Sequence, residues 1–98
     1  MTITKTAAGD ALTLLLEGRL DTSTAPELEK ELNDSLPGVK ELTLDLKDLV
    51  YLSSAGLRVV LTTQKRMNKQ GKMTVRNVCD DIMEVFEITG FVDLLTIE

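Results

Sequence analysis

The chain has 98 residues, 43% of them apolar and 28% charged, and its 11 basic and 16 acidic residues give a net charge of −5. This length and apolar content predict a single domain, residues 1–98, with one modest core. The acidic balance argues against direct nucleic-acid binding, and no apolar run reaches the roughly 20 residues of a membrane span, so we expect no membrane insertion.

The first half of the chain predicts a hairpin, a helix and a third strand. Residues 3–7 and 11–18 read as two strands joined at Gly9-Asp10, a pair that favours a tight turn. A helix with one apolar face follows, and Thr24 with Glu27 forms a capping-box pattern at its start. Pro37-Gly38 ends that helix, and residues 40–49 alternate leucines with polar residues as a half-buried strand does. The apolar face of the helix comprises Ala25, Leu28, Leu32 and Leu36.

The second half alternates helix and strand. Residues 54–70 read as a helix that ends before Gly71, 72–78 as a strand, 80–89 as a helix that stops at Gly90, and 94–97 as a short closing element. The residues expected to face inward are Leu57, Val60, Leu61, Met67, Ile82, Val85, Phe86 and Thr89. This order predicts an α/β fold, a small mixed β-sheet of four to five strands covered by three to four helices.

Several absences restrict the chemistry. The chain has no histidine, so it builds neither a Ser-His or Cys-His nucleophile pair nor a histidine-ligated metal site, and it has no phosphate-binding glycine loop. We therefore expect no cofactor and no metal. Cys79, the one cysteine, is interpreted as a small structural residue in a reduced, cytoplasmic protein. The segment Met1 to Lys5 does not resemble the start of a signal peptide.

Two adjacent serines, Ser53 and Ser54, stand between the third strand and the second long helix. Either serine suits the N-cap of that helix, a position worth about 0.5–2 kcal/mol. The second serine, followed by Ala55 and Gly56, suggests a surface of small residues that a partner or a phosphoryl donor approaches closely. Ligands and modifications tend to gather where such strands end and helices begin.

The segments LEGRLDTSTAPELEKEL and LTLDLKDLVYLSSAGLRVVL resemble the STAS family, the domains shared by bacterial anti-sigma factor antagonists and sulfate transporters. The resemblance implies the STAS-like fold of the antagonists. In those proteins the serine of this motif is phosphorylated by the partner anti-sigma factor, a serine kinase. Counting back from Gly56-Leu57 places the acceptor on Ser54, with Ser53, which replaces the family's aspartate, as the alternative. Asp21 matches the family's aspartate near the first helix and is expected at the partner surface.

The resemblance therefore implies an anti-sigma factor antagonist that is not an enzyme. Its unphosphorylated form binds the kinase and releases a sigma factor. Phosphorylation of Ser54 adds about −1.5 to −2 charge and switches binding off. The residues expected to bind the partner are Asp21, Ser53, Ser54, Gly56 and Arg58. The alternative within the family is a stand-alone STAS subunit of a lipid-transport or signalling assembly.

Other candidate residues admit more than one interpretation. Arg58, Thr62, Lys65 and Lys69 share a helix face that is either solvated or a docking surface for an acidic partner. Asp45 and Asp48 are two hard metal ligands, or simply solvated strand residues. A hydrolase with Ser54 as nucleophile and Asp45 as base lacks a histidine or a nearby lysine to activate the hydroxyl, and is disfavoured.

Overall fold

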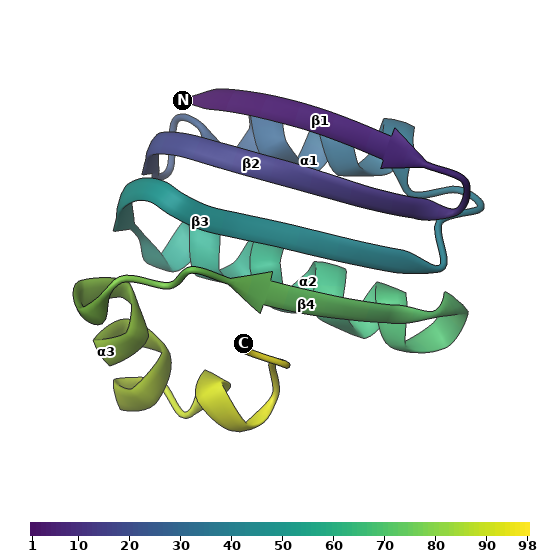
Figure 1. Ribbon diagram of the computed structural model, residues 1–98. Coiled ribbons are helices and arrows are strands. Elements are labelled where there is room, and N and C mark those ends of the chain that lie inside the picture. The colour runs from purple at the N-terminus through teal and green to yellow at the C-terminus, as the bar shows by residue number, and fades with distance from the viewer.

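A computed structural model describes residues 1–98 as a four-stranded sheet in the order β1-β2-β3-β4, with helices α1 and α2 behind it (Figure 1). Strand β1 runs antiparallel to β2, whereas β2, β3 and β4 are parallel. The predicted mixed α/β architecture is thus confirmed. The elements are β1 (Thr2–Ala8), β2 (Ala11–Leu20), α1 (Ala25–Ser35), β3 (Glu41–Leu52), α2 (Ser54–Gln70), β4 (Lys72–Arg76), α3 (Asp80–Ile88) and a 3-10 turn, η1 (Phe91–Asp93).

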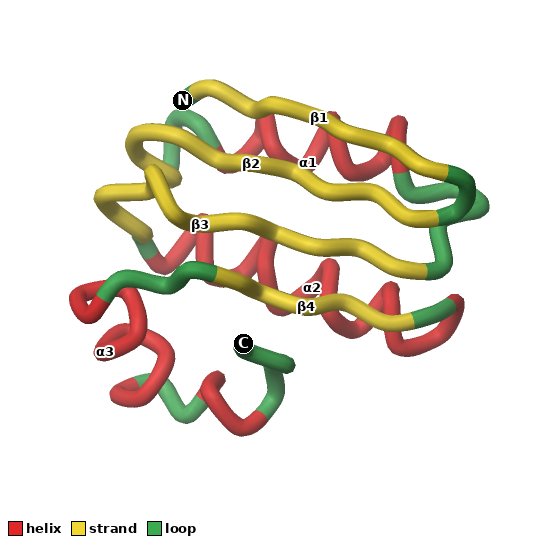
Figure 2. Tube along the Cα trace, in the orientation of Figure 1, coloured by secondary structure: helices red, strands yellow, loops and turns green.

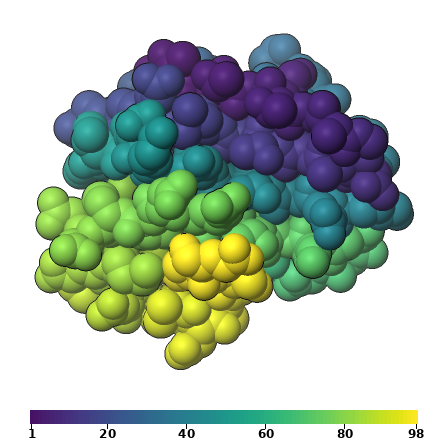
Figure 3. Space-filling view, in the orientation of Figure 1, coloured from purple at the N-terminus to yellow at the C-terminus, as the bar shows by residue number.

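The core lies between one face of the sheet and the two long helices, and Ile82 and Phe86 of α3 are buried in it as well. Alternate leucines of β2 and β3 are buried there, because side chains along a strand point to opposite faces and only one face is covered. On the other face Thr13, Thr43 and Thr74 stand opposite one another across three strands. Figure 3 shows the molecule from this side, with the N-terminal half of the chain in the upper part and the C-terminal residues, green and yellow, in the lower part. The leucines are Leu12, Leu14 and Leu16 of β2 and Leu42, Leu44 and Leu46 of β3.

Strands β2 and β3 are longer than predicted and end in an irregular, curled segment (Figure 2). The register pairs Leu15 with Asp45 but Glu17 with Asp48, and later Gly18 with Leu49 but Arg19 with Tyr51. At each of these two steps β3 has one residue more than β2, which is a β-bulge. The bulges interrupt the alternation of buried and exposed residues. For this reason the predicted strands ended at residues 18 and 49, before the observed ends of β2 and β3.

Helix α2 is buried over a wider face than its leucines predict. Val59, Thr63 and Gln64 are buried as well as the expected Leu57, Val60 and Met67, whereas Leu61 is only half-buried. The prediction of Leu61 as a core residue is therefore wrong in part. The reason is that α2 packs on the sheet and also against α1, so its buried stripe is rotated away from Leu61.

Gly71 follows α2, as predicted, but its backbone is extended (φ 179°) and does not take the left-handed conformation common for a glycine at a helix end. A Cβ at this position would overlap the backbone carbonyl of Lys40. That carbonyl accepts a hydrogen bond from the Lys72 amide at 2.9 Å, which holds it against the chain at Gly71. The glycine is therefore required by the close approach of two backbones.

The C-terminal segment turns back toward β4 (Figure 1). The short closing element predicted over residues 94–97 makes one parallel bridge, between Val75 and Ile97, and does not form a fifth strand of the sheet. Thr89, expected to face inward, is exposed, and its hydroxyl donates to the Val85 carbonyl at 2.7 Å at the end of α3. A hydroxyl that donates to a carbonyl at the end of its own helix is satisfied without burial. The predicted helix, residues 80–89, was therefore one residue longer than α3.

Candidate functional site

The predicted site lies where two parallel strands end side by side. Leu20 of β2 stands opposite Leu52 of β3, so Asp21 and Ser53 emerge at the same edge of the sheet. The Ser53 amide donates to the Leu20 carbonyl at 2.9 Å, which ties the two strand ends together. The fold thus brings together the loop after β2 and the start of α2, although more than 30 residues separate them in sequence.

The two serines have different environments. Ser53 is the N-cap of α2: it is half-buried, and its Oγ accepts from the Gly56 amide at 3.2 Å. Ser54 is the first residue of the helix; it is exposed, and its hydroxyl makes no hydrogen bond within the protein. The structure therefore gives Ser53 the capping role that the sequence left open, and leaves the Ser54 hydroxyl free for a reaction or a partner.

Gly56 does not form the open small-residue surface that the sequence suggested. It is buried, and a Cβ there would lie 2.6 Å from Leu20 Cγ and 2.9 Å from the Leu20 carbonyl oxygen. Its missing side chain lets the first turn of α2 pack on the end of β2. A role for Gly56 in partner binding remains a prediction. Because Gly56 is buried, such a role would be indirect, through the position of α2.

Asp21 organises the loop before α1. Its Oδ1 accepts from the Ser23 hydroxyl at 2.8 Å and from the amides of Ser23 and Thr24 at 3.0 and 3.1 Å. These bonds, that of the Ser23 hydroxyl first and then that of the Thr24 amide, hold the pKa of Asp21 below its ordinary value of 3.8. The carboxylate is thus fixed at the edge of the sheet in its charged form at neutral pH.

The predicted capping box of Thr24 and Glu27 is wrong. Thr24 makes no side-chain cap bond to α1. Its hydroxyl instead accepts from the Asp21 amide at 2.8 Å and donates to the Arg19 carbonyl at 2.8 Å. A local turn competes successfully for the threonine side chain, because Asp21 already satisfies the Thr24 amide.

Replacing Asp21 with alanine is expected to lower stability in a pH-dependent way. Because folding lowers the pKa of Asp21, its contribution is present above the ordinary value of 3.8 and is lost as the pH falls through the folded value. Urea unfolding at pH 7 and at about pH 2.5 should show a difference between wild type and Asp21→Ala that shrinks in acid. Asp48→Ala removes an exposed carboxylate that accepts no hydrogen bond, and serves as the control. An Asp21→Ala deficit of equal size at both pH values would contradict the prediction.

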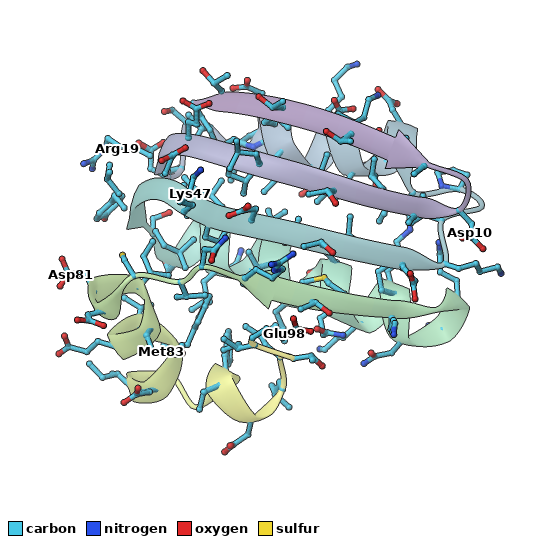
Figure 4. The ribbon with its side chains drawn as sticks, viewed as in Figure 1. Asp10, Arg19, Lys47, Asp81, Met83 and Glu98 are labelled. Atoms are coloured by element: carbon cyan, nitrogen blue, oxygen red, sulfur yellow. The ribbon has the colours of Figure 1, made fainter.

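Sequence reasoning missed two residues beside Asp21. Arg19 lies with its Cζ 4.1 Å from the ring centroid of Tyr51 and its Nε 3.7 Å from Asp21 Oδ2. Figure 4 places Arg19 at the edge where β2 and β3 end, opposite the edge that carries Asp10. Val50 and Tyr51 are both exposed, at 69% and 41%, because the second bulge turns two successive residues outward. In the sequence, the only sign of this exposed surface was that two apolar residues, Val50 and Tyr51, stand next to each other shortly before the serines.

On its other side Ser54 borders an apolar hollow of about 350 Å³ between α2 and the C-terminal segment. The hollow was not predictable, because Thr89 and Phe91 reach it only when the chain turns back after α3. Arg58 also lines a second hollow, which lies between α1 and α2 and is lined by Glu29 and Thr62 among others. The residues around the first hollow are Ser54, Leu57, Arg58, Leu61, Thr89 and Phe91.

The predicted cationic face of α2 is present. Arg58, Thr62, Lys65 and Lys69 are all exposed. The three cations form no ion pair, whereas Lys30 pairs with Asp34 at 3.2 Å on the neighbouring helix α1. An acidic protein thus presents a row of free positive charges beginning one turn from Ser54.

The remaining candidates lie away from the serines. Asp45 precedes Ser53 by eight residues along β3, which would span about 26 Å in a regular extended strand, and its carboxylate makes no hydrogen bond to Ser54, so the structure does not offer it as a base for Ser54. Its Oδ1 accepts from Asn77 Nδ2 and the Lys47 amide, both at 3.0 Å. Burial alone raises the pKa of Asp45, but these hydrogen bonds outweigh it and lower the pKa overall. Cys79 is exposed before α3 and fills no space in the core.

Taken together, a mixed sheet backed by two helices, with a fixed carboxylate and a free serine at the carboxyl edge of its parallel strands, defines a small regulatory binding domain. The chain belongs to the STAS family, since the STAS domain model matches residues 2–98. None of its helices combines the length and the apolar character needed to span a bilayer.

Similar proteins agree with this assignment. The chain is 35% identical over 99 residues to BtrV of Bordetella bronchiseptica, named as an anti-sigma factor antagonist, covering 99% of this chain and 85% of BtrV. It is 36% identical over 80 residues to the anti-sigma-B factor antagonist of Staphylococcus aureus, and the match covers 80% of this chain and 74% of that protein. Its fold matches the anti-sigma factor antagonist SpoIIAA in its unphosphorylated form, with a TM-score of 0.84 and 15% identity over 99% of this chain and 88% of SpoIIAA. The Bacillus SpoIIAA in its phosphorylated form also matches, with a TM-score of 0.78 and 15% identity over 99% and 91%.

Proposed function

We propose that this protein is an anti-sigma factor antagonist whose unphosphorylated form binds a serine-kinase anti-sigma factor and releases a sigma factor. The observation that carries the proposal is the exposed, unbonded hydroxyl of Ser54 beside the fixed carboxylate of Asp21. Two relatives named as antagonists, at 35% and 36% identity, support it over a stand-alone subunit of a transport or signalling assembly.

In this proposal the partner transfers the γ-phosphoryl group of ATP to Ser54 Oγ. A new P–O bond forms at the serine, the bond to the leaving ADP breaks, and the hydroxyl proton passes to a base of the kinase. The phosphorylated SpoIIAA structure retains the same fold, which supports a modification that changes the surface rather than the architecture. A doubly charged group at the centre of a docked surface must lose its water, so the modified protein binds the partner poorly.

The same residues support a binding role rather than an enzymatic one. Ser54 has no hydrogen-bonded base, and the chain contains no histidine to supply one. Around Ser54 the surface instead offers contacts for a protein: the charged loop at Asp21, the exposed pair Val50 and Tyr51, and the apolar hollow beside Phe91. We place the protein in the cytoplasm, in keeping with its single unpaired cysteine.

Incubation with the cognate anti-sigma factor and ATP is expected to label wild type and Ser53→Ala but not Ser54→Ala. The reason is that the Ser53 hydroxyl is engaged at the helix start, whereas that of Ser54 is free. Phosphopeptide mass spectrometry locates the group. If Ser53→Ala abolishes the labelling and Ser54→Ala does not, the acceptor is Ser53. If wild type is not labelled at all, the proposal that the partner is a kinase for this protein is refuted.

The cationic face of α2 is expected to steer the partner. Reversing Arg58, Lys65 and Lys69 to glutamate should slow association at low salt and have much less effect near 1 M salt, where the screening length is roughly 3 Å. Stopped-flow association rates measure the effect. Reversal of Lys40 and Lys47, exposed cations outside α2, is the control. Equal low-salt rates for wild type and the triple variant would show that this face is only solvated.

A further inference from the structure

Arg58 lies one helical turn after the proposed phosphorylation site and has no partner. Ser54 and Arg58 are both exposed, both line the apolar hollow, and are four residues apart on α2. Of the other three arginines, Arg19 is held by Asp21 and Tyr51, Arg66 donates to Asn33 at 3.0 Å, and Arg76 is the last residue of β4, on another element. Arg58 makes neither a hydrogen bond nor an ion pair in the structure.

We infer that Arg58 binds the phosphoryl group of phosphorylated Ser54, so that the modification creates an ion pair within α2; this inference rests on the proposed phosphorylation. Residues four apart are neighbours on a helix surface, separated by a rise of about 6 Å. Helical side chains lean toward the helix N-terminus, so Arg58 leans toward Ser54. An acid placed four residues before a base is also the more favourable order of such a pair.

The chemistry of the two groups fits. A guanidinium presents a planar fork of donors that matches two phosphate oxygens, and such charge-assisted bonds are among the strongest in proteins. Competition for Arg58 is small, because its neighbours one turn away on α2 are Ser54, Ala55, Leu61 and Thr62, none of them acidic. Glu29 of α1 shares the second hollow with Arg58 but forms no ion pair with it.

The pair gives phosphorylation a second effect on binding. In the unmodified protein the Arg58 guanidinium is free to meet an acidic group of the partner. Once Ser54 carries a phosphoryl group, that group occupies Arg58 and neutralises the cation one helical turn from the site. The modification therefore adds a charge to the surface and also withdraws a docking contact from it.

The test uses the full chain with phosphoserine installed at position 54 during synthesis, so that no kinase is needed. Thermal melts compare the phosphorylated and unmodified forms of wild type, Arg58→Gln, Arg58→Lys and Lys65→Gln. We expect phosphorylation to raise the Tm of wild type by about 4–8 °C, Arg58→Gln to lose at least half of that rise, and Arg58→Lys to recover part of it. Lys65→Gln removes an equal charge from the same helix face, but one that lies roughly 16 Å along the helix from Ser54, beyond the screening length, so this variant should keep the increase in Tm.

A second readout is the phosphate itself. Titration followed by ³¹P NMR should give a lower second pKa for phosphoserine 54 in wild type than in Arg58→Gln, since the guanidinium favours the doubly charged form. No other titratable side chain lines the hollow beside Ser54.

Equal Tm rises in wild type and Arg58→Gln, or equal losses in Arg58→Gln and Lys65→Gln, would overturn the inference. Because the phosphoserine is installed chemically, this outcome is independent of the partner. Failure of the anti-sigma factor to label Ser54 would refute the proposed function, whereas an unchanged phosphate pKa in Arg58→Gln would refute the ion pair.

Discussion

Substituting Ser54 with glutamate is expected to weaken the complex with the anti-sigma factor at least about 30-fold, which corresponds to about 2 kcal/mol. The new carboxylate imitates part of the phosphate charge at an exposed position that, in the proposed complex, the partner covers. Stability should hardly change, because an acid in the first turn of a helix is favourable by about 0.3–1 kcal/mol and no acid occupies the first turn of α2. Titration calorimetry measures the affinity, and thermal melts measure the stability.

The control for this change is Thr6→Glu. It introduces the same charge at an exposed residue of β1, outside the surface around Ser54. We expect Thr6→Glu to bind like wild type. A Ser54→Glu protein that binds normally would refute the proposed switch, and a fall in its Tm of more than about 8 °C would mean that Ser54 is needed for folding.

Replacing Gly71 with alanine is expected to destabilise the protein by about 3 kcal/mol, the upper end of the cost of overpacking. The added Cβ meets the Lys40 backbone carbonyl, not a flexible side chain. That carbonyl cannot withdraw easily, because it accepts from the Lys72 amide at 2.9 Å while the Lys40 amide donates to Asp10 at 2.8 Å. For a domain of this size the Tm should fall by roughly 12–24 °C.

Gly38→Ala is the control that distinguishes the steric overlap at Gly71 from the strain of placing alanine in a left-handed backbone conformation. Gly38 has φ +84° but open space around its Cα, so alanine there costs only the left-handed conformation, about 1–2 kcal/mol. Urea unfolding of both variants should rank Gly71→Ala as clearly less stable than Gly38→Ala. The opposite ranking would mean that the chain at Lys40 and Gly71 relaxes apart at little cost.

The sequence by itself determined the order and type of the regular elements and the buried faces of β3 and α1. The alternation of Leu42, Leu44 and Leu46 located the covered side of β3, and the spacing of Leu28 and Leu32 located that of α1. These patterns are readable because each repeats with the period of its element, two residues for a strand and 3.6 for a helix. The serine pair and Asp21 were likewise visible as candidates, since their position at element ends is a local property of the chain.

Only the tertiary structure decided where those candidates lie and what they contact. The bond between the Ser53 amide and Leu20 joined segments far apart in sequence, and the Ser53 side chain, not that of Ser54, capped α2. The bulges of β3 exposed Val50 and Tyr51, and the returning C-terminal segment brought Phe91 to Ser54. Gly56 proved to be a packing residue for the same reason: its neighbour Leu20 comes from another strand. Such contacts depend on register and on chain direction after a turn, and neither has a periodic signature in the sequence.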